Sequence, residues 1–390
     1  MTVPLLDLKA QYATIGEQLE AEVLEVMRSA RYVMGPKVEQ LEQQVADYVG
    51  AKYGVGCASG TDALLLALMA LDIGPGSAVI TTPYTFFSTV SSITRLGALP
   101  LFADIEPRTY NIDPAQVAQI LEQCDRDIEG RAVHRPSGRV VEALLPVHLF
   151  GQAADSDALL ELCQRYDVAL VEDAAQAIGT RDAAERMAGS IGLLACFSFF
   201  PSKNLGGLGD GGMITTDDEL LAQRLRALRS HGAAVKYYHD EVGINSRLDA
   251  LQAAVLSIKL QYLESWHAGR IANADRYRAL LDRPELRGKV EAPLAPQKGR
   301  HIYNQFVVRA QRRDELRSFL QSRGIGCEIY YPLPLHLQRC FAFLGHSVGS
   351  LPNSELAAEQ TLALPVYPEL SDEQAAQVVE AMVDFYRSGE

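Results

Sequence analysis

The 390-residue sequence lacks several features that membrane, secreted and nucleic-acid-binding proteins share. No apolar run reaches the ~20 residues that a membrane-spanning helix needs. The first residues, MTVPLLDLKAQY, contain no basic segment followed by an apolar one, so we expect no secretory signal. The net charge is −13, whereas nucleic acid requires a basic surface. We therefore expect a cytoplasmic protein that binds neither membranes nor nucleic acid.

The six cysteines form no C-x-x-C pair, and several lie in apolar runs. This pattern favours reduced cysteines in the core of a cytosolic protein over a disulfide framework. We predict no metal site. Internal repeats and low-complexity linkers are also lacking. With 48% hydrophobic residues, the chain can bury a large core. We predict an N-terminal arm and large domain over residues 1–260 and a small C-terminal domain over residues 261–390.

Apolar strands and amphipathic helices alternate through the large domain. We expect strands at 53–58, 78–82, 99–103, 141–147 and 168–171, with helices at 63–71, 114–123 and 156–165 between them. Repeated strand–helix–strand units predict an α/β fold with a mainly parallel sheet and helices on both faces. In such sheets, ligands bind at the carboxyl ends of the strands.

The remaining segments carry weaker patterns. We interpret residues 1–12 as an irregular arm and the polar segment 125–139 as a surface insertion. Residues 246–262 begin a long helix that would link the domains. In the small domain we expect a strand at 302–308, a helix at 312–323 and a capping box at 371–374 that opens the final helix.

The most informative stretch is CFSFFPSKNLGGLGDGGMITT, at residues 196–216. Two short apolar strands flank a glycine-rich loop with a single cation, Lys203, at its start. An ammonium group among apolar side chains is desolvated, so its pKa falls and the free amine becomes a nucleophile. For an arbitrary lysine, a surface position on a hairpin loop is the more common explanation. Other features of the chain shift the balance toward a reactive lysine.

The junction between a strand and a helix at SGTD, residues 59–62, is one of these features. Small and hydroxyl side chains at a helix N-terminus leave backbone N–H groups free to bind phosphate. Ordinary helix capping by Ser59 or Thr61 is the alternative.

A further feature is Glu172–Asp173, which ends a buried strand, where a carboxylate needs a donor or a cation. A helix cap is again possible, but such a carboxylate could also hold a proton on a heterocyclic nitrogen. Pyridoxal phosphate (PLP) needs that partner, together with a lysine, a phosphate cup and an aromatic ring to stack on. Lys203, residues 59–61 with Ser198, and an aromatic from residues 84–86 could supply them.

Motifs along nearly the whole chain resemble the DegT/DnrJ/EryC1/StrS sugar aminotransferases, which are fold-type I PLP enzymes. The motifs are SGTDAL at 59–64, PYTF at 83–86, PVHLFG at 146–151, VEDAAQAIG at 171–179, FSFFPSKNLGGLGDGG at 197–212, RSHG at 229–232, GINSRLDALQAA at 243–254 and YYPLPLH at 330–336. The pair formed by VEDAAQAIG and SFFPSKNLGGLGDGG is the most specific of them.

The resemblance implies a role for each matching residue. Lys203 would form the Schiff base with PLP, Asp173 would pair with the pyridine nitrogen, and Gln176 would bind the phenolic oxygen. The phosphate would be bound by Gly60, Thr61, Ser198 and, from the partner subunit of a homodimer, Asn245, while Phe86 would stack on the ring. Arg247, Tyr331, His148 and His336 match positions that would contact substrate. For the two histidines, a hydrogen-bonded structural role is equally compatible with the motif.

By resemblance, the reaction transfers an amino group from L-glutamate to a nucleotide-linked keto-sugar and leaves 2-oxoglutarate. Residues 245–249, NSRLD, look more like relatives acting on 3-keto than on 4-keto sugars. The sequence chooses neither the sugar nor a uridine or thymidine carrier. Two alternatives stay open, namely a PLP-dependent sugar dehydratase or lyase on the same fold and a non-catalytic binding or regulatory homologue. Because Lys203, Asp173 and Gln176 are all present, transamination is favoured.

Overall fold

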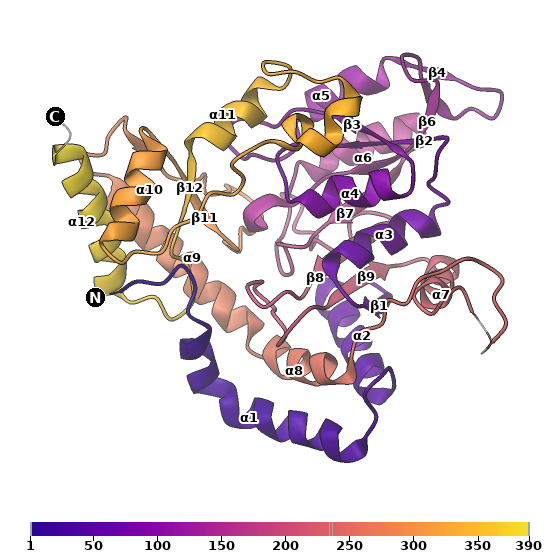
Figure 1. Cartoon of the computed structure of the whole chain (residues 1–390), viewed down its shortest axis with the longest axis horizontal. Coiled ribbons are helices and arrows are strands. Elements are labelled where there is room, and N and C mark those ends of the chain that lie inside the picture. Colours follow the sequence, from indigo (N-terminus) through magenta and orange to yellow (C-terminus); the bar gives the residue numbers. More distant parts are fainter. Residues whose placement is uncertain (1, 234, 236, 389–390) are drawn as a thin grey trace.

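The computed structural model describes residues 2–233, 235 and 237–388 (Figure 1). Its centre is a sheet in which seven of the described strands follow the order β1-β9-β8-β7-β6-β2-β3. Their bounds are β1 Tyr53–Cys57, β2 Ser77–Thr81, β3 Leu99–Phe102, β6 Arg139–Leu145, β7 Ala169–Asp173, β8 Leu194–Ser198 and β9 Gly212–Thr216. The pairs from β3 to β8 are parallel, whereas β9 runs antiparallel to both β8 and β1. The mainly parallel sheet confirms the predicted α/β class.

Helices cover both faces of this sheet, since the strands are buried almost continuously and successive side chains point to opposite faces. On one face, α3, α4 and α7 pack against Val79, Val171 and Ile214. On the other face, α2 and α8 pack with Phe197 and Met213, and α5 and α6 cover β2, β6 and β7. The bounds are α2 Pro36–Val49, α3 Gly60–Ala70, α4 Phe87–Arg95, α5 Pro114–Leu121, α6 Ser156–Tyr166, α7 Glu219–Leu228 and α8 Ala250–Leu260.

Three segments differ from the expectations. The supposed irregular arm turns into helix α1 (Leu8–Ser29) at Leu8, because the side chain of Asp7 accepts hydrogen bonds from the N–H groups of Lys9 and Ala10. The polar segment 125–139 contains most of a hairpin, β4 (Cys124–Arg126) and β5 (Ala132–His134), which extends the sheet through pairing with β6. Helix α4 was not expected, since its sequence FSTVSSITR is rich in Ser and Thr, which are poor helix formers.

The long helix expected from residue 246 is two helices, because α8 ends at Leu260 and α9 (Leu263–Leu281) begins three residues later. Helix α9 leads to a second, three-stranded antiparallel sheet of β10 (Val290–Glu291), β11 (Phe306–Ala310) and β12 (Thr361–Leu364). Helices α10 (Arg313–Ser322) and α12 (Asp372–Ser388) pack on it, at the left of Figure 1. Ser371 and Gln374 exchange hydrogen bonds, which confirms the capping box.

Part of the C-terminal half returns to the large sheet. It comprises the short helices η2 (Leu335–Leu337) and η3 (Arg339–Leu344) and helix α11 (Pro352–Gln360). Leu335, Phe341 and Leu351 pack against Val90 and Phe102. The domain boundary at residue 260 therefore stays a prediction. Among the described residues, no helix combines the length and the apolar character needed to cross a membrane.

The cysteines follow the expectation for most positions. All six have free thiols; four are buried, Cys124 is partly buried and Cys340 is exposed.

Candidate active site

The predicted cofactor residues gather where the parallel strands end. Asp173 is the last residue of β7, Ser198 is the last of β8, and Gly60 is the first residue of α3. Phe86 lies between β2 and α4, and Lys203 follows β8. Because β2, β7 and β8 run in the same direction, these positions share one edge of the sheet.

Lys203 lies in the turn that links β8 to the glycine-rich loop, and its N–H donates a 2.8 Å hydrogen bond to the Phe200 carbonyl. The residue keeps part of its surface open, while burial of its amine lowers its pKa to about 8. The negative charge of Asp173 opposes this shift. A pKa of about 8 leaves a useful fraction of free amine near neutral pH, which supports the prediction of a reactive lysine.

Asp173 is buried, and burial raises the pKa of its carboxyl group. Two hydrogen bonds oppose that effect. Thr89 Oγ1 donates to Oδ2 at 2.7 Å, and the Ala175 N–H donates to Oδ1 at 3.2 Å. The positive charge of Lys203 also lowers the pKa. A further positive partner, such as a protonated pyridine nitrogen, would therefore stabilise the ionised form of this carboxyl group.

Gln176 has a defined amide orientation. Its Oε1 accepts a 2.7 Å hydrogen bond from the Phe150 N–H, which can only donate. The Nε2 group must therefore point the other way, and it donates to the Tyr331 hydroxyl at 3.2 Å. This leaves Nε2 as a donor beside the Tyr331 hydroxyl, as binding of a phenolic oxygen requires.

The three residues predicted to bind phosphate lie together. A Cβ atom on Gly60 would come within 2.6 Å of Ser198 Cβ, so only glycine allows this approach. Thr61 Oγ1 lies 2.6 Å from Ser88 Oγ. The alternative of helix capping is also realised, since Ser59 Oγ accepts from the Asp62 N–H at 3.1 Å. Capping and phosphate binding are compatible, because the cap uses Ser59 and leaves the hydroxyls of Thr61 and Ser198 available.

The aromatic side of the site is formed by Phe86 and Tyr331. The Phe86 side chain is 56% exposed, which is unusual for a phenylalanine and leaves its face free for a stacked ring. Its ring centroid lies 6.1 Å from that of Tyr331. Burial raises the pKa of Tyr331, and the nearby Asp173 charge adds to the increase, so its hydroxyl stays protonated. Taken with Lys203, Asp173 and the Gly60 junction, these groups fit pyridoxal phosphate.

The two histidines predicted to contact substrate are both buried and paired with glutamates. His148 Nε2 lies 2.9 Å from Glu172, and its Nδ1 accepts from the Ala154 N–H at 3.1 Å. This fixes the proton on Nε2. His336 Nε2 lies 3.0 Å from Glu355. Both environments satisfy the structural alternative as well, so a role in substrate binding stays a prediction.

Asn245 and Arg247 lie on the polar turn before α8. The intervening Ser246 fixes this turn, because its hydroxyl donates to Asp62 in the first turn of α3 and accepts from the Ala58 N–H. Asn245 is exposed, and within the described chain Arg247 forms no hydrogen bond or ion pair. The turn therefore presents an amide and a cation to the outside, close to the N-terminus of α3.

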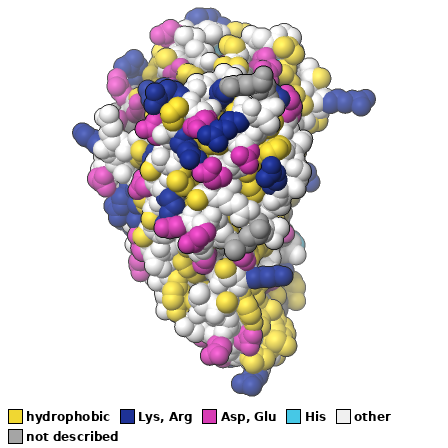
Figure 2. Space-filling view, turned by 90° about the vertical axis from the view of Figure 1, so that its left-hand side faces the viewer, with side chains coloured by type: hydrophobic (Ala, Val, Ile, Leu, Met, Phe, Trp, Pro, Cys, Tyr) yellow, Lys and Arg dark blue, Asp and Glu magenta, His cyan; other side chains and the backbone are white. Residues whose placement is uncertain are grey.

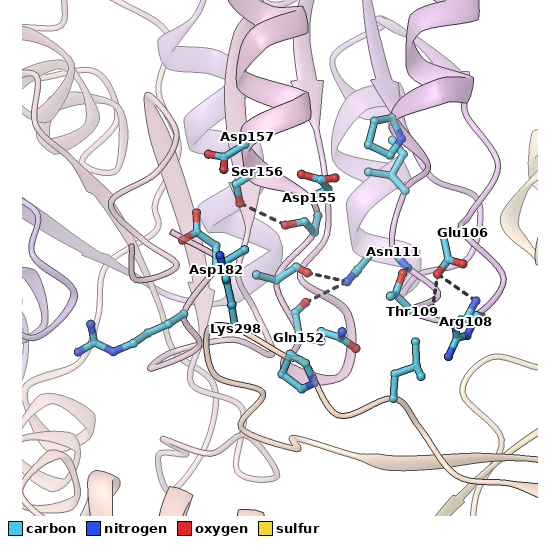
Figure 3. A pocket seen from close by; sticks show the side chains of 18 of the residues that line it. Glu106, Arg108, Thr109, Asn111, Gln152, Asp155, Ser156, Asp157, Asp182 and Lys298 are labelled. Atoms are coloured by element: carbon cyan, nitrogen blue, oxygen red, sulfur yellow. Dashed lines mark hydrogen bonds between the residues drawn. The ribbon is translucent and has the colours of Figure 1, made fainter. Parts of the chain in front are cut away.

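A separate cavity of ≈440 Å³ is lined by the loops that follow β3, β6 and β7 (Figure 3). None of the predicted site residues lines it. Much of its charge is already balanced, since Asp182 pairs with Arg186 and Arg300 pairs with Glu264. Asn111, which points across the cavity wall in Figure 3, donates to the carbonyls of residues 152 and 153. The predicted site residues therefore lie at the strand ends and not at this cavity.

Comparison with known proteins links this site to sugar chemistry. Residues 13–383 match the DegT/DnrJ/EryC1/StrS aminotransferase family. The chain is 46% identical to a "Pleiotropic regulatory protein" of Geobacillus stearothermophilus, over 99% of both chains. It is 39% identical to a UDP-N-acetyl-3-dehydro-alpha-D-glucosamine 3-aminotransferase of Acidithiobacillus ferrooxidans, over 96% of both chains. A solved structure of S. venezuelae DesV in complex with a ketimine intermediate is 40% identical, with a TM-score of 0.90 over 99% of this chain and 98% of that one.

Proposed function

This chain belongs to the DegT/DnrJ/EryC1/StrS aminotransferase family, and on that basis we propose that it transfers an amino group from L-glutamate to a nucleotide-linked keto-sugar. Members of the family depend on PLP. When bound, PLP acts as an electron sink that stabilises the carbanion formed at the carbon atom losing its proton. The observation that carries the proposal is that Lys203 and the buried Asp173 lie at one strand edge, with the Lys203 pKa lowered to about 8.

Lys203 supplies the base. Its Nζ can remove the proton from the Cα atom of the amino donor, and in the second half-reaction it can return a proton to the sugar carbon. The lowered pKa suits both steps, because the amine gains and loses a proton close to neutral pH. Asp173, which accepts hydrogen bonds from Thr89 and the Ala175 N–H, would pair with the pyridine nitrogen of the cofactor. Gln176 Nε2 would donate to the phenolic oxygen of the cofactor and orient its ring.

We propose a 3-keto sugar as the acceptor. The sequence NSRLD at 245–249 resembles relatives that act at that position. The relative from Acidithiobacillus ferrooxidans, named for a 3-dehydro sugar, supports the same position. Arg247 is the candidate to bind the diphosphate or a sugar hydroxyl, since its cation has no partner among the described residues.

The direct test is amine transfer. Purified protein loaded with PLP should convert more than one equivalent of L-glutamate per site to 2-oxoglutarate only when a nucleotide keto-sugar is present, with the amino-sugar detected by mass spectrometry. Parallel assays with 3-keto and 4-keto sugars on UDP and dTDP carriers identify the position and the carrier. Loss of water from the sugar without amine transfer would instead identify a dehydratase.

A regulatory role is the second candidate, favoured by the name of the relative from Geobacillus stearothermophilus. The presence of Lys203, Asp173 and Gln176 in one site argues for catalysis, because a protein that only binds needs no reactive amine. A protein that remains colourless and takes up no PLP would favour the regulatory alternative.

We also propose a homodimer in which Asn245 completes the phosphate site of the partner subunit. The exposed position of Asn245 supports this arrangement. Apolar side chains are also exposed on α1 and in the following loop, namely Tyr12, Leu24, Met27, Tyr32 and Val33. In Figure 2 hydrophobic side chains gather toward the lower end of the molecule, at the height of α1 in Figure 1. Contiguous exposed apolar surface is typical of a subunit interface.

A further inference from the structure

The turn that carries Lys203 is bonded to the segment 302–304, which leads into β11 of the small C-terminal sheet. Asn204, the residue after Lys203, is buried and faces Asn304, which lies two residues before β11. Asn304 Nδ2 donates a 2.8 Å hydrogen bond to Asn204 Oδ1. Asn204 Nδ2 in turn donates to the Ile302 carbonyl at 3.3 Å. Two hydrogen bonds thus join the residue beside the reactive lysine to one short segment, 302–304.

The orientation of both amides follows from these contacts. The Ile302 carbonyl can only accept, so Asn204 must turn Nδ2 toward it and Oδ1 toward Asn304. Asn304 must then present Nδ2 to Asn204, which leaves its own Oδ1 buried without a partner among the described residues. An unsatisfied buried acceptor costs about 1–3 kcal/mol. The stability of the fold alone would therefore not favour an asparagine at position 304.

The same segment also touches the loop that orients Gln176. The Ile302 N–H donates to the Gly151 carbonyl at 3.0 Å. A Cβ atom on Gly151 would lie 2.7 Å from Cγ1 of Ile302 and 3.0 Å from the backbone nitrogen of Asn304, so this approach requires glycine. Gly151 follows Phe150, whose N–H fixes the Gln176 amide. Residues 302–304 therefore contact both the lysine turn and the loop that holds Gln176.

The segment itself is firmly anchored in the small C-terminal part. Tyr303 adopts φ 47°, a left-handed conformation that is unfavourable for a bulky residue. The buried Arg270 of α9 holds it there, because its guanidinium donates to the carbonyls of Tyr303 and Val366 at 3.0 and 2.9 Å. A strained backbone that is fixed at both sides is typical of a segment whose position matters for function.

We propose that Asn304 is a positioning residue, which acts through Asn204 to hold the Lys203 amine in its reactive place. The inference rests on the proposed role of Lys203. The segment that leads into the small C-terminal sheet thus helps to position the Lys203 amine, although that sheet supplies none of the predicted cofactor-binding residues. Because a displacement of about 1 Å can cost a factor of about 100 in rate, loss of one such bond should be measurable.

The test compares Asn304→Ala with Asn273→Ala. Asn273 is a matched control, because it is equally buried, lies on α9 and donates one 2.7 Å hydrogen bond to the Tyr367 carbonyl without touching the lysine turn. We expect Asn304→Ala to lower kcat about tenfold to a hundredfold with little change in KM. In the apoprotein, the pH at which Lys203 is half-labelled by an amine-specific reagent should also move away from about 8. Asn273→Ala should lower Tm alone.

A double variant tests whether Asn204 and Asn304 act through the hydrogen bond between them. If Asn204 and Asn304 act as one unit, Asn204→Ala combined with Asn304→Ala should lose no more activity than either single variant. Should Asn304→Ala fail to fold, Asn204→Ser tests the same bond from the other side. A variant of Asn304 that lowers Tm but keeps the wild-type kcat and the wild-type labelling of Lys203 would overturn the proposal. If the wild-type protein itself binds no PLP at Lys203, the proposed function fails instead.

Discussion

Thr89 Oγ1 donates a hydrogen bond of 2.7 Å to the Oδ2 atom of Asp173, and the two residues lie on different elements, α4 and β7. Thr85 Oγ1 lies 3.0 Å from Thr89 Oγ1. Because the Thr89 hydroxyl gives its proton to Asp173, it must accept from Thr85. A short chain of hydroxyls thus supports the carboxylate of Asp173, and it opposes the rise in pKa that burial causes.

Replacement of Thr89 by valine should raise the pKa of Asp173 further, since the bond to Thr89 is the first of the contacts that lower it. We expect kcat to fall about tenfold, as the loss of one hydrogen bond worth ~1.5 kcal/mol implies. Activity should also begin to fail at a higher pH on the acid side of the profile. Thr85→Val is the control, because it removes a buried hydroxyl that does not touch Asp173. Equal losses in the two variants would contradict a specific role for Thr89.

Asp173→Asn keeps the shape of the side chain and removes its charge. We expect the variant to retain PLP but to lose turnover by roughly three orders of magnitude, because a lost buried charge partner costs ~4 kcal/mol or more. Asp182→Asn serves as the comparison, since Asp182 is equally buried but is bonded to Arg186 and lies outside the site. Near-normal turnover of Asp173→Asn would mean that another group protonates the ring.

The sequence allowed prediction of the residues at strand ends, and it failed where contacts are long-range. Asp173 ends an apolar run, so its place at the carboxyl edge of the sheet followed from the α/β pattern alone. Thr89 was missed because α4, whose sequence is rich in Ser and Thr, was not expected. Its partner lies 84 residues away in the sequence. No local pattern encodes that contact.

Glu172 and Asp173 show a related limit. Both are buried carboxylates at the end of the same strand, and successive side chains of a strand point to opposite faces. Glu172 accepts hydrogen bonds from the N–H groups of Gly189, Ile191 and Gly192 and from His148. Its oxygens are therefore fully used in holding a loop. The strand pattern alone does not separate this structural carboxylate from Asp173, which only the family resemblance singled out in the sequence.

Lys203 should titrate as an unusually acidic lysine. In the apoprotein, its labelling by an amine-specific reagent should rise with pH and reach its midpoint near 8, compared with about 10.4 for an unperturbed lysine. In Asp173→Asn the midpoint should fall below 8, because the Asp173 charge stabilises the ammonium form and raises its pKa. Peptide mass spectrometry measures both values. An unchanged or higher midpoint in Asp173→Asn would show that the two charges do not interact.

Because of His267, we expect the fold to lose stability in acid. The residue is buried against Gly179, both ring nitrogens lack partners in the described chain, and burial lowers its pKa to about 3. The unfolded chain binds a proton near pH 6.5 and the folded chain only near pH 3, so stability is lost as the pH falls between these values. The loss is about 1.4 kcal/mol per pH unit for this group.

His267→Leu should therefore flatten the dependence of unfolding free energy on pH between 6 and 4, as measured by urea denaturation. The exposed His239 provides the control, and His239→Leu should leave the slope unchanged. His301, which is also buried with a pKa lowered to about 3, keeps part of the slope in both variants. A slope in His267→Leu as steep as that of the wild type would place the acid sensitivity elsewhere.

Mixed dimers test whether Asn245 serves the partner's site. Suppose that Lys203→Ala and Asn245→Ala are each nearly inactive as homodimers. In a mixed dimer with shared sites, one site carries both defects and the other carries neither. The intact site takes its lysine from the Asn245→Ala chain and its asparagine from the Lys203→Ala chain. Differently tagged, co-purified mixed dimers should then recover about half of the wild-type activity, if the two sites work independently.

The activity of the mixed dimer would differ if the sites were not shared. If Asn245 served the site of its own chain, each site of the mixed dimer would carry one defect and no activity would return. Re-association into homodimers also gives no activity, so tandem purification on both tags must show that the mixed species persists during the assay. A persistent mixed dimer without activity would leave Asn245 with a structural role before α8, where Ser246 already fixes the turn through Asp62 and the Ala58 N–H.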